Sequence, residues 1–166
     1  MPLLDKPLAE LLKYQGRNPR PADFDAFWDA SIAEMEALDP AVELRPAEFS
    51  VPGVECFDLY FNGTGGARIH AKYLRPATSA APHPAVLQFH GYTGNAGDWS
   101  SKLGYVALGF SVAAMDCRGQ GGTSTDPGGV TGTTMRGQII RGLDDPPEKL
   151  LFRNIFLDTA KLARVV

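Results

Sequence analysis

AVLQFHGYTG (residues 85–94) and SVAAMDCRGQG (residues 111–121) are the two stretches that decide the fold. Each begins with a short, nearly continuous apolar run, at residues 85–89 and 111–115, of the kind that forms strands buried on both faces of a parallel sheet. The pattern between them, at residues 98–108, predicts a crossover helix. Strand, helix and strand in this order predict an α/β domain.

Upstream of this unit the sequence predicts a β-hairpin and two helices. Residues 55–61 and 67–74 are strand-like runs on either side of the turn-forming stretch Asn-Gly-Thr-Gly-Gly at residues 62–66. In residues 22–38 the apolar side chains recur at steps of three and four, as in a helix with one buried face. Residues 5–14 predict a further short helix with an acidic residue at its start.

Downstream, residues 119–147 are rich in Gly, Thr, Asp and Pro with little periodicity, which predicts a long loop of the kind that carries function or forms interfaces. Residues 150–166 resume a helical pattern, and no Gly or Asn stop signal follows it. We therefore expect one incomplete domain over residues 1–166. Its parts are an N-terminal helical extension (1–50), the first strands of the sheet (51–118), a long loop (119–149) and a helix cut at the C-terminus (150–166).

Composition excludes several classes of protein. The 166 residues are 44% hydrophobic and carry 16 Lys+Arg against 19 Asp+Glu, whereas nucleic-acid-binding proteins usually show a basic surplus. No apolar run approaches the about 20 residues that a spanning helix needs, and no signal-like segment opens the chain, so we expect a cytoplasmic protein. Cys56 and Cys117 are too few for a disulfide scaffold and lack zinc-site spacing, which predicts buried thiols, no metal and no cofactor.

The motif His90-Gly91-Tyr92-Thr93-Gly94 directly follows the first of the two buried strands. A His-Gly turn at that place is where hydrolases build half of an oxyanion hole. Backbone N–H groups in a tight turn, free of strand pairing, can point at the oxygen that becomes negative when an ester carbonyl is attacked. A turn chosen for its geometry alone is the alternative, and His90 itself is expected to be structural.

The second motif carries a resemblance to a known family. Arg118-Gly119-Gln120 matches the Arg-Gly-Gln motif that follows the corresponding strand in the acetyl xylan esterase and cephalosporin C deacetylase family, carbohydrate esterase family seven. The chain also resembles that family at residues 7–11, 23–28, 91–92, 141–144 and 156–160, so the resemblance covers nearly the whole chain. It implies the N-terminal half of an α/β-hydrolase fold, with a mostly parallel sheet, N-terminal helices and an early β-hairpin.

The triad that the resemblance implies is missing from the chain. Such a hydrolase needs a nucleophile in a G-x-S-x-G elbow, followed by an acid and a histidine, and this sequence has no such elbow and no histidine after His90. In the family the elbow Gly-x-Ser-Gln-Gly follows shortly after the helix that here ends at Val166. The resemblance therefore implies an esterase that removes acetyl groups from small acetylated sugars or similar alcohols. Its Ser-His-Asp triad is expected beyond residue 166, so we expect this chain alone to be inactive; a natural pseudo-enzyme is the alternative.

By the same resemblance, the backbone N–H of Tyr92 supplies half of the oxyanion hole, and its side chain lines the acyl pocket. Arg118, Gly119 and Gln120 are expected to form a structural motif near the site. The planar guanidinium of Arg118, with five donors, suits the task of tying the loop to the catalytic floor. Direct contact between Arg118 and the substrate is the alternative.

The expected partners are a small acetylated substrate, the missing C-terminal half of the same protein, and further copies of the chain. The resemblance implies a ring-like homo-oligomer, commonly a hexamer, and the long loop is its candidate contact. Four apolar residues of the loop could be buried there: Met135, Ile139, Ile140 and Leu143. Arg136 and Arg141 could pair with carboxylates at the rim.

Two other interpretations remain in view. A non-catalytic binding or assembly module could keep the hydrolase half-fold and use the loop at residues 119–147 as its interface. Gly119-Gln120-Gly121 could also be part of a dinucleotide-binding fingerprint, but Ser124 replaces the third glycine and no helix is predicted to begin there. The partial glycine pattern is therefore better explained by a loop.

Overall fold

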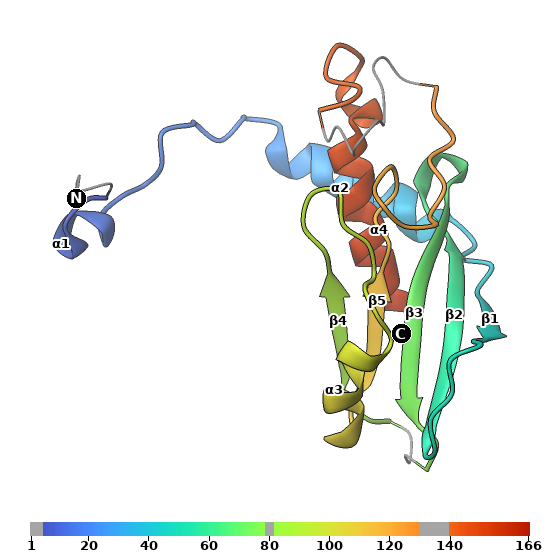
Figure 1. Cartoon of the computed structure of the whole chain (residues 1–166). Coiled ribbons are helices and arrows are strands. Elements are labelled where there is room, and N and C mark those ends of the chain that lie inside the picture. Colours follow the sequence, from blue (N-terminus) through green and yellow to red (C-terminus); the bar gives the residue numbers. More distant parts are fainter. Residues whose placement is uncertain (1–4, 79–81, 130–139) are drawn as a thin grey trace.

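A computed structural model of the chain describes residues 5–78, 82–129 and 140–166. Its centre is one five-stranded sheet with the strand order β1-β2-β3-β5-β4 (Figure 1). The strands are β1 (Glu43–Pro46), β2 (Val54–Asn62), β3 (Arg68–Pro76), β4 (Ala85–Phe89) and β5 (Ser111–Met115). The helices are α1 (Leu8–Leu11), α2 (Phe24–Ala37), α3 (Leu103–Ala107) and α4 (Leu151–Val165), with 3-10 turns η1 (Thr64–Gly66), η2 (Ser100–Lys102) and η3 (Pro147–Lys149). The predicted α/β architecture is confirmed.

The predicted hairpin and crossover unit are both present. Strands β2 and β3 pair antiparallel over their whole length, and the 3-10 turn η1 lies between them where the sequence predicts a turn. Strands β4 and β5 run parallel with Ala85 opposite Ser111, and η2 and α3 form the crossover between them. The crossover helix is shorter than the residues 98–108 that the sequence predicts.

The prediction of a mostly parallel sheet is wrong for the described strands. Strand β1 pairs antiparallel with β2, β2 with β3, and β3 with β5, so β4 and β5 make the one parallel pair among the described residues. The reason is that the hairpin does not form a separate ribbon. Its second strand pairs with β5 at residues 71–74, which places the antiparallel strands in the same sheet as the crossover unit.

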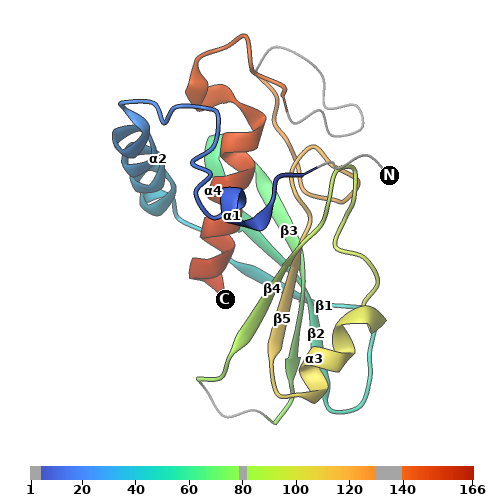
Figure 2. The ribbon, with the colours of Figure 1, turned by 90° about the vertical axis from the view of Figure 1, so that its left-hand side faces the viewer.

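The two faces of the sheet are covered by different helices (Figure 2). Successive side chains of a strand point to opposite faces, and in β5 Met115 joins the core on the α4 side whereas Val112 joins the core on the α3 side. Helix α4 contributes Leu151, Ile155 and Leu162 to its core, at helical spacing. All the residues of β5 are buried, as expected for a strand covered on both faces.

The N-terminal helices differ in how they pack. Helix α2, predicted over residues 22–38, packs on α4 with Met35 2% exposed and with the Trp28 and Phe156 rings 6.1 Å apart. Helix α1 is shorter than predicted, has no buried residue and lies away from the rest of the chain (Figure 1). Its Leu8 is 71% exposed and the following Leu12 is 78% exposed. This segment therefore presents apolar side chains that the described residues do not cover.

The segment after β5 contains turns and bends but no helix or strand in residues 116–129 and 140–146. The predicted contact residues Met135, Arg136 and Ile139 lie outside the described residues. Ile140 and Leu143 are exposed, whereas Arg141 is buried in an ion pair with Asp126 of the same chain. No helix in the described parts of the chain has the length and apolarity that crossing a membrane requires.

Candidate active site

The loops that carry the two sequence motifs meet at the carboxyl ends of the parallel strands β4 and β5. Ligands of open α/β sheets bind at this end of the strands. After β4 the chain makes a tight turn in which the N–H of Gly94 donates to the carbonyl of Gly91 at 3.0 Å. Thr93 has a φ of 61°, so the turn has the positive dihedral that a type II turn requires at its third residue. Tyr92 occupies the position before it.

His90 holds this turn to the neighbouring loop through its imidazole ring. The backbone N–H of Cys117 donates to Nε2 of His90 at 3.0 Å, and Nδ1 of the same ring lies 2.8 Å from the carbonyl of Gly91. Because Nε2 accepts a hydrogen bond, the ring hydrogen is on Nδ1 and is donated to Gly91. Both ring nitrogens are thus engaged with the backbone. This agrees with the structural role expected for His90.

Gln120, in the same loop as Cys117, supports the turn at the residue after Tyr92. Its side-chain oxygen accepts a hydrogen bond from the backbone N–H of Thr93 at 2.7 Å, and the N–H of the next residue, Gly121, donates to the carbonyl of Gly94 at 2.9 Å. A Cβ at position 121 would lie 2.6 Å from the carbonyl oxygen of Thr93, so this close approach requires glycine. The sequence placed Gln120 near the site but did not reveal its partner.

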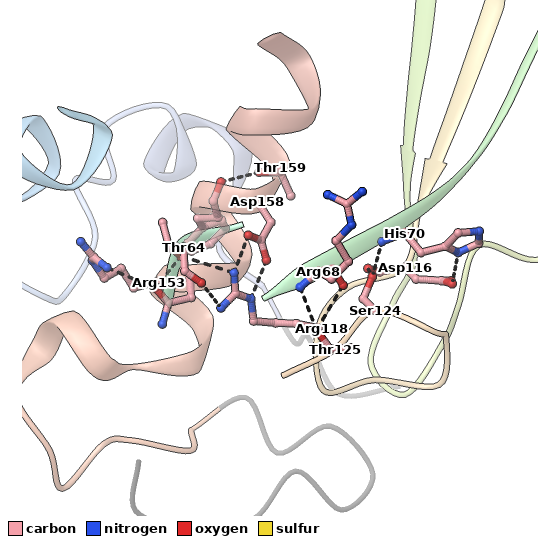
Figure 3. Close-up of polar contacts among 12 residues, drawn as sticks. Thr64, Arg68, His70, Asp116, Arg118, Ser124, Thr125, Arg153, Asp158 and Thr159 are labelled. Atoms are coloured by element: carbon pink, nitrogen blue, oxygen red, sulfur yellow. Dashed lines mark hydrogen bonds and ion pairs between the residues drawn. The ribbon is translucent and has the colours of Figure 1, made fainter. Parts of the chain in front are cut away.

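Arg118 is 2% exposed and makes a bidentate ion pair with Asp158 of α4, with both N···O distances at 2.6 Å (Figure 3). A second terminal nitrogen donates to the carbonyl of Thr64 at 2.9 Å. Burial raises the pKa of Asp158 to about 6, against the opposing effect of Arg118. Arg118 therefore ties the loop after β5 to α4 and to η1. Its side chain makes these contacts, and only the short stretch of backbone to Gln120 connects it to the turn. Gly119, with a φ of 67°, lets the chain turn back toward Gln120.

The backbone N–H of Tyr92 has no hydrogen-bond partner among the described residues. Tyr92, which is 62% exposed, lines a pocket of about 260 Å³. The pocket, called here the Tyr92 pocket, is lined by His90, Gly91, Tyr92, Cys117, Gln120, Phe152 and Ile155. The structure thus brings together the two predicted site residues Tyr92 and Gln120. Arg118 lies outside this pocket.

Cys117 is the one thiol in this pocket. Burial raises its pKa to about 11, with smaller contributions from the nearby carboxylates of Asp158 and Asp116. A thiol with a raised pKa is a poor nucleophile because the thiolate is the reactive form. Cys117 is therefore a lining residue rather than a catalytic nucleophile.

A buried network behind the turn was not predicted from the sequence. Asp116, 3% exposed, accepts hydrogen bonds from the backbone N–H groups of Ala96 and Thr123 and lies 2.7 Å from Nδ1 of His70 (Figure 3). Burial favours the neutral acid, but these donors outweigh it and lower the pKa of Asp116 to about 2. Asp58 lies 2.8 Å from Nε2 of the same histidine. Alternating polar residues in β2 and β3 were the available signal.

The serine and histidine side chains near the turn do not form a pair of nucleophile and base. Ser124 donates its hydroxyl hydrogen to the carbonyl of Asp116 at 2.5 Å and accepts the N–H of His70 at 2.8 Å, so it is fully engaged in holding the loop. Neither His70 nor His90 has a free ring nitrogen next to a serine within the described residues. Nε2 of His83 lies 2.6 Å from the hydroxyl of Ser111, but Ser111 is buried at the start of β5, at the end of the strand opposite to this site. Over the same residues, no three His, Cys, Asp or Glu side chains gather in a way that could hold a metal ion. The site therefore contains a hydrogen-bond donor for an oxyanion, the Tyr92 N–H, without a nucleophile and its general base among the described residues.

The chain matches known proteins over its whole length and over about half of theirs. The family model of acetyl xylan esterase (AXE1) matches residues 1–166. The chain is similar to acetyl xylan esterase 1 from Thermoanaerobacterium sp. JW/SL YS485, with 57% identity and a TM-score of 0.92 over 98% of this chain and 51% of that one. It is also similar to the acetyl xylan esterase from Paenibacillus sp. R4, with 26% identity and a TM-score of 0.85 over 96% of this chain and 51% of that one. The chain thus spans about half the length of these structures. Because the family model matches every residue, the chain belongs to the acetyl xylan esterase family.

Proposed function

We propose that this chain is the N-terminal half of a serine carboxylic-ester hydrolase that removes acetyl groups from acetylated carbohydrates or similar small molecules. The observation that carries the proposal is the turn at residues 91–94. The N–H of Tyr92 has no hydrogen-bond partner among the described residues. The residues before and after it are held in place, Gly91 by His90 and Thr93 by Gln120. Preorganised donors of this kind stabilise the charge that develops in acyl transfer.

In this reaction a serine from the remaining half attacks the acetyl carbonyl, and the carbonyl oxygen becomes negative. The Tyr92 N–H donates to that oxygen, together with a donor from the residue after the nucleophile. The histidine and aspartate that move the proton also belong to the remaining half. The contribution of this chain is therefore electrostatic and positional.

The Tyr92 pocket fits the acyl group of such a substrate. Its lining combines aromatic and aliphatic side chains, Phe152 and Ile155 of α4, with the ring of Tyr92. Its volume of about 260 Å³ leaves room for an acyl group. Acetyl specificity and the inclusion of cephalosporin C among the substrates belong to the proposal and follow the family resemblance.

The remaining half of the protein is the first proposed partner. Strand β4 lies at the edge of the described sheet, and its Phe89 is 47% exposed. Phe156 of α4 is also 47% exposed, and Leu8 of α1 is 71% exposed. Unpaired apolar edges and exposed apolar patches favour association. We infer that the remaining half pairs with β4 and covers these side chains.

The further proposals concern location and assembly. A cytoplasmic location is supported by the two free, buried thiols, Cys56 and Cys117, since disulfides are rare in reducing compartments. A homo-oligomer is supported by the exposed apolar side chains of Ile140 and Leu143 in the loop after β5. A hexameric ring follows the family resemblance alone.

The second candidate function is a non-catalytic binding or assembly module. The observation that favours it is the engagement of Ser124, His70 and His90 in structural hydrogen bonds, which leaves the two loops around Tyr92 without a serine and histidine pair among the described residues. Such a module would keep the Tyr92 pocket for binding and would not turn over an ester. The two candidates differ in what the chain does once the remaining half is supplied.

The test is hydrolysis of p-nitrophenyl acetate by the chain alone and by the chain joined to the remaining half of the protein. We expect no turnover above background from the chain alone, because covalent catalysis needs the nucleophile and its base. The joined protein is expected to be active, and the matched control, in which the elbow serine of the remaining half is replaced by alanine, is expected to be inactive. Turnover by the chain alone, or an inactive joined protein that still binds the ester, would overturn the esterase proposal.

A further inference from the structure

His70 of β3 is a buried histidine whose ring lies between two carboxylates, Asp58 and Asp116, and Figure 3 shows its contact with Asp116. Its side chain is 6% exposed, Nδ1 lies 2.7 Å from Asp116 and Nε2 lies 2.8 Å from Asp58. An ionised carboxylate only accepts hydrogen bonds, and a neutral imidazole carries a single ring hydrogen. Both short contacts are hydrogen bonds only when both nitrogens are protonated. The geometry therefore fits an imidazolium.

The two carboxylates next to His70 favour the same form. The ring of Tyr60 on β2 packs against the imidazole, with the ring centroids 5.1 Å apart. His70 faces a pocket of about 550 Å³ that also contains Asp98 and Lys72, and the ammonium group of Lys72 donates to the carbonyl of Gly97. Burial opposes a charged ring, but the hydrogen bonds to Asp116 and Asp58 outweigh it and raise the pKa of His70.

Asp116 connects this histidine to both active-site loops. One carboxylate oxygen accepts the N–H of Ala96 at 2.6 Å, in the loop after β4. The other oxygen, which faces His70, accepts the N–H of Thr123 at 3.0 Å, in the loop after β5. Ser124 adds a parallel link, because it accepts the N–H of His70 and donates to the carbonyl of Asp116. Asp116 and Ser124 thus connect both loops to His70 on β3.

The same two loops meet again at the turn that holds Tyr92. There Thr93 donates to Gln120, and Gly121 donates to Gly94. The loop after β5 is therefore clamped at its base by Asp116 and at its tip by the turn. A shift of Asp116 moves both loops and with them the direction of the Tyr92 N–H.

We propose that His70 is a positioning residue for the oxyanion-binding turn: its imidazolium, held between Asp58 and Asp116, fixes Asp116 and through it the two loops that aim the Tyr92 N–H. The proposal rests on the proposed esterase function. When His70 loses its proton, one ring nitrogen presents a lone pair to a carboxylate, and the clamp weakens. The rate of the chemical step then falls while substrate binding changes little, because the oxyanion donor acts mainly on the transition state.

The experiment uses the complete esterase, that is, this chain joined to the remaining half. The kcat and KM for p-nitrophenyl acetate are measured from about pH 6 to about pH 10, a range that covers the ionisation of a histidine with a raised pKa. For His70→Gln we expect kcat to fall about 10- to 100-fold, because the Tyr92 N–H would then be misplaced relative to the oxyanion. We expect KM to change by less than about twofold. In the wild type we expect kcat to decline at alkaline pH as His70 loses its proton, and in His70→Gln we expect this decline to be absent.

His83→Gln is the matched control, because His83 is a partly buried histidine that lies near a hydroxyl, that of Ser111, rather than between carboxylates. It is expected to keep the wild-type kcat and the alkaline decline. If His70→Gln keeps the wild-type kcat, or loses activity with the alkaline decline unchanged, the positioning role is wrong.

Asp58→Asn keeps the proposal testable where His70→Gln fails to fold, because the side chain of Asp58 is 33% exposed and asparagine can still accept from His70. Removing this charge lowers the pKa of His70, so the alkaline decline is expected to move to lower pH. A decline that stays in place would overturn the proposal.

Nitrogen NMR of the His70 ring in the same protein separates this inference from the proposed function. When the pH is raised, we expect the ring to lose its proton at a higher pH than an ordinary histidine does. A ring that loses its proton at the ordinary pH or below it would contradict the inference even in an active enzyme. An inactive wild-type esterase with a protonated His70 would instead contradict the proposed function and, with it, the positioning role.

Discussion

Asp116 follows β5 and accepts hydrogen bonds from three parts of the chain that are distant in sequence: β3, the loop after β4 and the loop after β5. A buried carboxylate without such donors would be costly, and its pKa would rise. Here the donors, including His70 and the Ala96 and Thr123 N–H groups, lower the pKa to about 2. The folded state therefore binds this proton much more weakly than the unfolded chain does.

The pH dependence of stability tests this residue. Since the folded pKa of about 2 lies below the ordinary value of 3.8, the ionised Asp116 stabilises the fold above about pH 4, and the contribution is lost as the pH falls toward 2. The shift in pKa corresponds to a contribution on the order of 2 kcal/mol from Asp116 to the free energy of unfolding. We expect Asp116→Asn to be less stable than the wild type at neutral pH in urea unfolding, with the difference shrinking below about pH 4. A difference that stays constant down to pH 2 would contradict this.

At the scale of elements, the sequence predicted local units well and their partners poorly. The hairpin of β2 and β3, the strands β4 and β5 and the helices α2 and α4 follow from periodicity and turn residues within each segment. Strand β1 was missed because it has four residues and a burial pattern that is mostly exposed. The antiparallel pairing of β3 with β5 was missed because it joins residues about 40 positions apart, which no local pattern records.

The same limit applies to the candidate site. The turn at Tyr92 and the loop with Gln120 could be predicted from motifs next to strands, but their contact could not. His70 and Asp116 are 46 positions apart, and Arg118 and Asp158 are 40 apart. Buried polar residues find their partners only when the fold brings them together. The donor geometry of its guanidinium indicated a structural role for Arg118 but not the side chain that it binds.

The Arg118–Asp158 pair joins the loop after β5 to α4, and its removal is expected to weaken that junction. Both side chains are buried, at 2% and 0% exposed. Asp158→Asn leaves the guanidinium without its counter-charge, so we expect a loss of about 3–5 kcal/mol in the free energy of unfolding. Urea unfolding followed by circular dichroism measures it. The control is Glu55→Gln, which breaks the exposed pair with Arg75 and should cost less than about 1 kcal/mol. Equal losses in the two variants would show that the buried pair has no special role.

At the scale of the whole molecule, the chain leaves apolar surface uncovered in several places. Helix α1 has no buried residue, β4 is an edge strand, and Phe152 and Phe156 of α4 are 38% and 47% exposed. These features fit a chain that spans half the length of the structures it matches. The loop after β5 also exposes Ile140 and Leu143. Our proposal that these two side chains form contacts between copies of the chain follows the family resemblance.

Light scattering tests that assignment. In the complete esterase, Ile140→Asp with Leu143→Asp places charges at side chains that are 64% and 67% exposed, so the fold should survive while an apolar contact between copies is lost. We expect the mass in solution to fall to a smaller assembly. Leu108→Asp, at a residue 75% exposed at the end of α3, is the control and should keep the parental mass. If the loop variant also keeps the parental mass, this loop is not the interface.

We propose that the backbone N–H of Tyr92 stabilises the oxyanion, and deleting that one hydrogen tests this role. Tyr92 precedes the positive-φ residue Thr93 in the turn closed by Gly94 and Gly91, and proline is favoured at this position of a type II turn. Tyr92→Pro therefore removes the donor and leaves the turn intact, whereas Tyr92→Ala removes the ring and keeps the donor.

The measurement is kcat for p-nitrophenyl acetate with the complete esterase and both variants. Loss of one oxyanion donor is expected to lower kcat about 100- to 1,000-fold in Tyr92→Pro, with a far smaller loss in Tyr92→Ala. If Tyr92→Pro folds and retains the kcat of Tyr92→Ala, the N–H does not stabilise the oxyanion and the account is wrong.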